Sequence, residues 1–135
     1  LYGSVLAESG FTDGIDMIIP VPLDPVRERR RGFNQSKCIA EGIASHCCLP
    51  VRSDILRRTG KSGSQTKRGR YERWENVEGL FTVTRPREIA GRHLLLVDDV
   101  ITTGSTVEAC VTALQSAGGV RVSVAALAAA QKLTV

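Results

Sequence analysis

The chain has 135 residues, a hydrophobic content of 42%, a charged content of 24% and a formal net charge of +4. This length and apolar content suffice for one compact domain with a single core. Because the sequence has neither a run of 18 apolar residues nor the basic and apolar start of a secretory signal, we expect a cytoplasmic protein without membrane insertion.

The first part of the chain reads as the end of a helix, a buried strand, a loop and a complete helix. Residues 1–12 carry apolar side chains at loose helical spacing before a glycine stops them, so we expect a fragment whose first helix is incomplete. The apolar run 17–19 is closed by two prolines, which is typical of a buried strand. Residues 23–33 are predicted to form a loop. Asn34 is a good N-cap, and the apolar spacing that follows it predicts a helix over 34–47.

The middle of the chain combines strand patterns with a cationic segment. Residues 49–58 read as a strand with uncertain edges, and residues 75–83 return to strand character. Between them, residues 59–74 are mostly small or cationic and leave little apolar surface to bury, which predicts a mobile loop. Residues 85–92 are predicted to form a turn.

The last part of the chain contains the most apolar strand. Residues 93–97 are typical of a central, fully buried strand. Apolar residues at helical spacing follow over 107–114, and residues 120–128 read as another strand. Because strands and helices alternate and the strands are almost continuously apolar, we predict an α/β fold with a mostly parallel central sheet flanked by helices.

Positive charge is concentrated in the middle of the chain. Residues 24–73 contain 13 Lys or Arg against 5 Asp or Glu, whereas the remaining residues contain 5 against 9. Such a segment suits a phosphate-rich partner, either a small polyphosphate or a nucleic acid. A solvated surface is the simpler alternative.

The segment LLLVDDVITTGST at residues 94–106 carries the chemistry of a ligand site. In an open parallel sheet, ligands bind at the carboxyl ends of the strands, where Asp98 and Asp99 are expected to emerge. The loop that follows enters a helix, whose free N–H groups and dipole favour an anion. We therefore predict a phosphate-binding loop formed by Thr102, Thr103, Gly104, Ser105 and Thr106.

The two carboxylates are expected to face a neutral part of the same ligand, because like charges repel in a partly desolvated site. A ribose 5-phosphate fits this description, with Asp98 and Asp99 accepting hydrogen bonds from the ring hydroxyls. Their negative field would also stabilise positive charge at the anomeric carbon, so both are candidate catalytic residues. The alternative is that Asp99 or Ser105 only caps the helix while Asp98 pairs with a cation.

The same segment closely resembles the phosphoribosyl pyrophosphate signature of type I phosphoribosyltransferases: an apolar strand, two acidic residues and a Thr-Thr-Gly-x-Thr loop. Further segments are similar to the ComF family of competence-associated, amidophosphoribosyltransferase-like proteins: IPVPL, RRRGFNQS, and Gln65-Thr66 followed by ERWENVEGLF. Members often carry an N-terminal cysteine-rich zinc module. The resemblance therefore implies that residues 1–135 are a phosphoribosyltransferase domain without that module and without part of the hood that recognises the acceptor.

The resemblance also implies roles for individual residues. Asp98 and Asp99 would hold the ribose hydroxyls, and residues 102–106 the 5-phosphate. The pyrophosphate would be bound after the first strand, by Pro22, Leu23 and Arg31. The mobile loop over the site would contribute Lys67 and Arg73. Mg²⁺ is expected to arrive on the substrate, without a direct protein ligand.

The implied reaction is displacement of pyrophosphate from phosphoribosyl pyrophosphate by a nitrogen nucleophile. The alternative is a non-catalytic module that binds a phosphoribosyl ligand and serves DNA uptake. The basic segment supports contact with single-stranded DNA, although aromatic residues that could stack on bases are few there: Phe33, Tyr71 and Trp74. A homodimer is plausible from the resemblance, and the sequence leaves the acceptor open.

Overall fold

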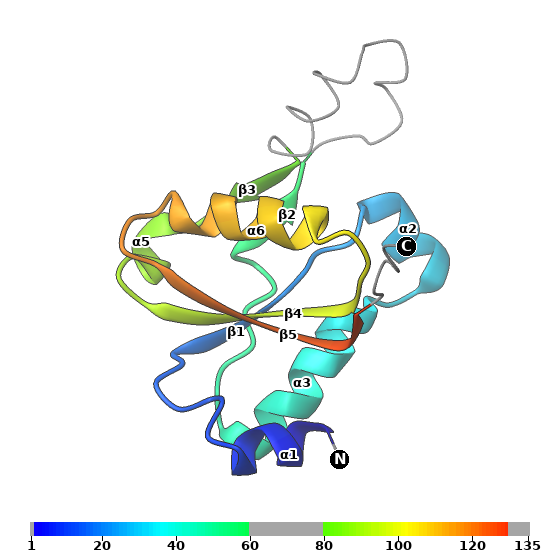
Figure 1. Cartoon of the computed structure of the whole chain (residues 1–135). Helices are drawn as coiled ribbons and strands as arrows, with labels where there is room; N and C mark the ends of the chain where they lie inside the picture. Colours follow the sequence, from blue (N-terminus) through cyan, green and yellow to red (C-terminus); the bar gives the residue numbers. More distant parts are fainter. Residues whose placement is uncertain (1, 60–79, 130–135) are drawn as a thin grey trace, which may run out of the picture.

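The computed structural model describes residues 2–59 and 80–129 as a parallel sheet with helices on both faces and a separate hairpin (Figure 1). The parallel sheet has the order β1-β4-β5, and the antiparallel hairpin is β2-β3. The predicted α/β fold with a mostly parallel central sheet is thereby confirmed. The elements in chain order are α1 (Tyr2–Glu8), β1 (Met17–Pro20), α2 (Pro25–Arg31), α3 (Gln35–Cys47), β2 (Leu56–Arg58), β3 (Phe81–Val83), α5 (Pro86–Ile89), β4 (His93–Ile101), α6 (Ser105–Gln115) and β5 (Arg121–Ala129).

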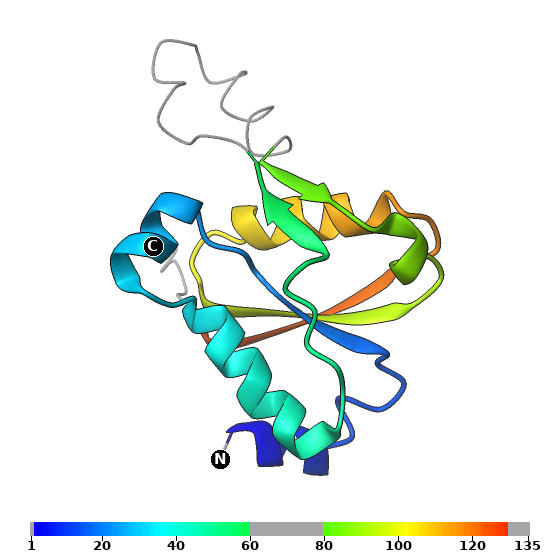
Figure 2. The ribbon, with the colours of Figure 1, turned by 180° about the vertical axis from the view of Figure 1, so that it is seen from behind.

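Strand β4 forms the centre of the core because both of its faces are covered. Figures 1 and 2 show α6 and the hairpin on one side of the sheet and α1 and α3 on the other. Leu94 and Leu96 pack in the cluster that includes α6, whereas Leu95 and Val97 pack in the cluster that includes α3. All four side chains are fully buried. Each leucine truncated to alanine is therefore expected to destabilise the fold by about 2 to 5 kcal/mol.

The prediction of a loop over residues 23–33 is wrong in part, because this segment contains α2. Asp24 is the N-cap and accepts a hydrogen bond from the Val26 N–H, Pro25 begins the helix, and Gly32 ends it with φ of 77°. None of the helical residues is buried. The helix was missed because it has no apolar stripe, although both of its ends carry ordinary helix signals.

Other boundaries also differ from the sequence-based expectation. The strand predicted over 49–58 is reduced to an isolated bridge at Val51 and to β2. The predicted turn at 85–92 contains the short helix α5. Strand β4 continues through both aspartates to Ile101, because β5 pairs with it that far. The helix predicted from Asn34 is confirmed as α3.

Several sequence-based predictions fall on residues that the structure does not describe. Lys67 and Arg73, and with them most of the predicted mobile loop, lie outside the described ranges. Within those ranges no helix is long and apolar enough to cross a membrane.

Candidate functional site

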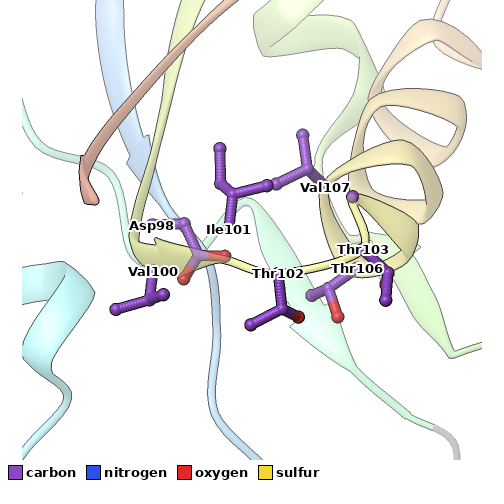
Figure 3. Close-up of a pocket in the computed structure, with 8 residues that line it drawn as sticks. Asp98, Val100, Ile101, Thr102, Thr103, Thr106 and Val107 are labelled. Atoms are coloured by element: carbon purple, nitrogen blue, oxygen red, sulfur yellow. The ribbon is translucent and has the colours of Figure 1, made fainter. Parts of the chain in front are cut away.

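The carboxyl end of β4 and the beginning of α6 form a small pocket, which we call the threonine pocket (Figure 3). It has about 210 Å³ of empty space, open solvent included, and its lining is Asp98, Val100, Ile101, Thr102, Thr103, Gly104, Thr106 and Val107. The structure thus brings Asp98 together with four of the five residues of the predicted phosphate loop. Asp99 and Ser105 do not line this pocket.

Local geometry explains how this loop enters α6. Gly104 has φ of 82° and is the N-cap of α6, so no side chain caps the helix from that position. A Cβ there would meet no protein atom within 4 Å, so the glycine is required by its backbone angle and not by packing. The Ser105 N–H donates to Thr103 Oγ1 at 3.3 Å. The alternative in which Asp99 or Ser105 caps α6 is therefore wrong.

Asp98 is held on the floor of the site by hydrogen bonds to one of its two oxygens. Its exposure is 9%, and its Oδ1 accepts from the Asp99 N–H at 2.8 Å and from the Ser36 hydroxyl at 3.4 Å. Burial raises the pKa of Asp98, and the neighbouring Asp99 carboxylate adds to this increase, whereas the two donors oppose it. Asp98 forms no ion pair with the residues that the structure describes, so the proposed pairing with a cation finds no support there.

Asp99 has a different environment although it is the next residue. It is half-buried, and its Oδ1 accepts from the Val100 N–H at 2.8 Å. Successive side chains of a strand point to opposite faces. Asp98 lines the threonine pocket and Asp99 does not, although the Asp99 carboxylate is near enough to raise the pKa of Asp98.

A second and larger cavity is lined by residues that follow β1 and by residues of β2, and we call it the arginine cavity. It holds about 740 Å³ of empty space, open solvent included, and its lining is Pro22, Leu23, Pro25, Glu28, Ser53, Asp54, Leu56, Arg57 and Arg58. Pro22 and Leu23, predicted to bind pyrophosphate, are among these residues. Arg31, the predicted anchor, is exposed at the end of α2 and does not line the cavity.

Arg57 and Arg58 are the cations that sequence reasoning did not single out. Arg58 lies 5.9 Å from the Phe81 ring centre, and its Nε is buried without a hydrogen-bond partner among the described residues. Neither arginine forms an ion pair with another described residue. The available signal was their position at the start of the cationic segment, but only the cavity lining shows that they lie beside Pro22 and Leu23, which follow β1.

Of the two acidic residues that line the cavity, Glu28 and Asp54, Asp54 is paired with arginines other than Arg57 and Arg58. Arg52 donates to both carboxylate oxygens of Asp54 at 2.9 Å and to Glu88 at 3.1 Å, and Arg85 lies 3.3 Å from Asp54. The hydrogen bonds from Arg52 lower the pKa of Asp54 to about 2. Asp54 therefore stays ionised and paired with Arg52 and Arg85 rather than with Arg57 or Arg58.

Within residues 2–59 and 80–129, no three His, Cys, Asp or Glu side chains are grouped so that they could hold a metal ion.

This arrangement, a parallel sheet with an acidic strand end and a hydroxyl-rich turn into a helix, defines a phosphoribosyltransferase domain. The family model described as the phosphoribosyl transferase domain matches residues 20–135, so the chain belongs to that family.

Curated relatives bear names that confirm the predicted ComF resemblance. Competence protein F of Haemophilus influenzae is 33% identical over 116 residues, which are 85% of this chain and 51% of that protein. DNA utilization protein YhgH of Escherichia coli K12 is 37% identical over 92 residues, which are 68% and 40% of the two chains. Competence protein ComFC of Bacillus subtilis is 34% identical over 92 residues, which are 67% and 34%. The chain thus matches between 34% and 51% of the length of these relatives.

Solved structures confirm the type I phosphoribosyltransferase fold. A purine phosphoribosyltransferase from Pyrococcus horikoshii has a TM-score of 0.59 at 19% identity, covering 93% of this chain and 69% of that one. The adenine phosphoribosyltransferase of Saccharomyces cerevisiae has a TM-score of 0.60 at 16% identity, covering 96% and 64%. At these identities the likeness concerns the fold alone.

Proposed function

We propose that this domain binds phosphoribosyl pyrophosphate across the carboxyl ends of β1 and β4 and transfers its phosphoribosyl group to a nitrogen nucleophile. The observation that carries the proposal is the position of Asp98 beside the threonine pocket, with the arginine cavity at the neighbouring strand end. This arrangement suits a ligand that has a neutral sugar between two anionic ends.

Each end of the ligand has its own binding residues in this proposal. The 5-phosphate accepts hydrogen bonds from the N-terminal amides of α6 and from the threonine hydroxyls. The pyrophosphate lies in the arginine cavity, where Arg57 and Arg58 join Pro22 and Leu23. The contributions of Arg31, Lys67 and Arg73 stay predictions.

The reaction exchanges one bond at the sugar for another. The bond between the anomeric carbon and the pyrophosphate oxygen breaks, and the electron pair leaves with pyrophosphate. The nitrogen nucleophile forms the new bond and afterwards loses a proton to water. Asp98 carries negative charge in a poorly hydrated position, so it stabilises positive charge on the sugar in the transition state. Asp99 is the second candidate ribose ligand.

Mg²⁺ fits this site as a companion of the ligand. The cation prefers one or two carboxylates together with substrate phosphates over a cage made of protein alone. We propose that it enters with the pyrophosphate and neutralises part of its charge.

A second candidate function rests on the names of the relatives. Proteins called competence protein F, ComFC and DNA utilization protein YhgH share this domain. The domain would then bind a phosphoribosyl ligand without turnover and serve DNA uptake, with the exposed arginines of α2 able to contact single-stranded DNA. A cytoplasmic location and a homodimer stay predictions in both cases.

Calorimetry with phosphoribosyl pyrophosphate and Mg²⁺ tests the proposed binding. We expect micromolar affinity and a strong loss in the variant that combines Asp98→Asn with Asp99→Asn; unchanged affinity in that variant would contradict the ribose assignment. Pyrophosphate release across a panel of bases and amines then separates the two functions, because binding without turnover for every acceptor favours the non-catalytic one. Salt-sensitive binding of single-stranded DNA that competes with the ligand would add support to that alternative.

A further inference from the structure

The hydrogen-bond ladder between β1 and β4 stops where the ligand is proposed to bind. The Val21 N–H donates to the Val97 carbonyl at 2.9 Å, one step beyond the end of β1. In a parallel ladder the next bond would run from the Asp99 N–H to the Val21 carbonyl. Instead, the Asp99 N–H donates to Asp98 Oδ1 at 2.8 Å, and the Val21 carbonyl accepts from Asn34 Nδ2 at 3.1 Å. Two side chains thus replace one ladder bond.

Asn34 uses both ends of its amide to connect β1 with α3. It is 8% exposed, and while Nδ2 donates to Val21, Oδ1 accepts from the Ser36 N–H at 2.9 Å and from the Lys37 N–H at 3.4 Å. An N-cap needs only an acceptor oxygen, which Asp or Ser also supplies. The donor that satisfies the Val21 carbonyl needs an amide, so capping alone does not explain this residue.

Ser36 connects the same helix end to β4. Its side chain is buried, and its hydroxyl donates to Asp98 Oδ1 at 3.4 Å. This distance is long for a hydroxyl and a carboxylate, and such bonds often tighten when a ligand binds. Among the described residues, both hydrogen bonds to the Asp98 carboxylate use Oδ1, which leaves Oδ2 for a ligand.

We propose that Asn34 and Ser36 are positioning residues that separate β1 from β4 at the site and orient Asp98 toward the sugar. Asn34 fixes the Val21 carbonyl, from which the chain continues into Pro22 and Leu23 of the arginine cavity. Ser36 fixes the carboxylate beside the threonine pocket. Through these two residues, the motif RGFNQS holds both halves of the site in position without touching the ligand. This inference rests on the proposed function for its ligand, but its geometry can be tested without any ligand.

The charge state of Asp98 gives a readout that capping alone would not change. The ionisable groups around it are Asp99 on its own strand and the Cys110 thiol on α6, which is also near Arg58 of β2. Burial raises the pKa of Cys110 to about 12, so this thiol stays neutral while carboxylates titrate. Removing the Ser36 hydroxyl takes away a donor that lowers the pKa of Asp98.

The test uses four variants of the 135-residue chain: Ser36→Ala, Ser36→Thr, Asn34→Asp and Asn34→Ala. The Asp99 amide proton reports the titration of Asp98 by NMR, because it donates to that carboxylate. Calorimetry with phosphoribosyl pyrophosphate and Mg²⁺, together with Tm, completes the comparison. Asn34→Asp retains an N-cap oxygen and loses the donor to Val21. If the Asn34→Asp variant does not fold, Asn34→Ser is measured in its place.

We expect Ser36→Ala to raise the pKa of Asp98 and Ser36→Thr to restore it. Asn34→Asp should weaken ligand binding about tenfold, as expected for loss of a positioning hydrogen bond, while Asn34→Ala loses the cap as well and has the lower Tm. An unchanged Asp98 titration in Ser36→Ala together with unchanged ligand affinity in Asn34→Asp would overturn the inference. A wild-type chain that binds no ligand would overturn the proposed function, and the titration would still decide the role of Ser36.

Discussion

The threonine pocket and the arginine cavity lie beside neighbouring strand ends but use different physical means to attract anions. Among the described residues, the lining of the threonine pocket contains no Lys or Arg and offers helix amides and hydroxyls, whereas the arginine cavity is larger and contains Arg57 and Arg58. Dipoles suffice for a small anion, and a more highly charged group calls for full cations. For the proposed ligand, we infer from this difference a direction in which the single phosphate binds at α6 and the pyrophosphate binds beside β2.

Asp98 lines the threonine pocket and follows Val97, whose carbonyl accepts from the Val21 N–H at the β1 exit, so its loss should have the largest effect. Asp98→Asn keeps the shape and removes the charge that accepts from the sugar hydroxyl, and we expect affinity for phosphoribosyl pyrophosphate to fall about 10- to 100-fold by calorimetry. Thr112→Ala, a change in the middle of α6 and outside both regions, is the matched control. Wild-type affinity in Asp98→Asn would contradict the claim that Asp98 binds the sugar between the two regions.

The same substitution should also change how stability depends on pH. Burial raises the pKa of Asp98, so the folded state holds this proton more tightly than the unfolded chain does. Stability is therefore greatest below the ordinary carboxyl pKa and falls as pH rises through the raised value. Asp98→Asn lacks this loss, and its Tm at neutral pH should exceed that of the wild type. An equal dependence of Tm on pH in both proteins would contradict the burial of a charged Asp98.

The arginine cavity is tested by Arg58→Gln, for which we expect the second largest effect. Loss of one charged donor should weaken binding of pyrophosphate and of phosphoribosyl pyrophosphate about tenfold, and leave ribose 5-phosphate binding unchanged. Arg31→Gln is the control, since Arg31 is exposed on α2. A larger loss in Arg31→Gln than in Arg58→Gln would favour the residue chosen from the sequence over the one indicated by the cavity.

Gly104→Ala is expected to weaken binding of ribose 5-phosphate and to leave binding of pyrophosphate unchanged. Alanine tolerates φ of 82° poorly, at a cost of about 1 kcal/mol, so the loop should shift or become less ordered. Ribose 5-phosphate affinity should fall about fivefold while pyrophosphate affinity is retained. Gly91→Ala places a methyl group at a similar φ of 72° outside the site and controls for backbone strain. A fall in pyrophosphate affinity alone would reverse the assigned direction.

The smallest effect is expected from the ion pairs behind the arginine cavity. Asp54→Asn removes the contacts to Arg52 and Arg85, but all three side chains are partly exposed. We expect Tm at pH 7 to change by less than about 2 °C and ligand affinity to change little. Because the pKa of Asp54 is lowered to about 2, its contribution is present above the ordinary carboxyl pKa and is lost as pH falls toward 2. A large Tm loss at pH 7 would show that these pairs support the cavity.

The regions differ in how far they could be predicted from the sequence. Asp98 and the residues of the threonine pocket are adjacent in the chain, so one motif described them, and β4 was evident from four consecutive apolar residues. Arg58 and Pro22 are brought together by tertiary structure, and no local pattern indicates that contact. Helix α2 escaped prediction because its caps, and not apolar burial, hold it.

The carboxyl end of β4 shows the same difference between what a local pattern predicts and what tertiary pairing adds. The strand was predicted to end at Val97 because the apolar run ends there. Pairing with β5 extends the strand to Ile101. In this register Asp98 lies opposite Ala126 of β5. The Asn34 cap was predicted, whereas its second bond to the Val21 carbonyl connects residues 13 apart and could not be read from the pattern.

The central claim is that one ligand lies across both regions, and NMR amide shifts measured with three ligands test it most directly. In the wild-type chain with Mg²⁺, ribose 5-phosphate should shift the amides of Gly104 and Thr106, pyrophosphate should shift those of Leu23 and Arg58, and phosphoribosyl pyrophosphate should shift both sets at once. Shifts confined to one region with phosphoribosyl pyrophosphate would contradict the account.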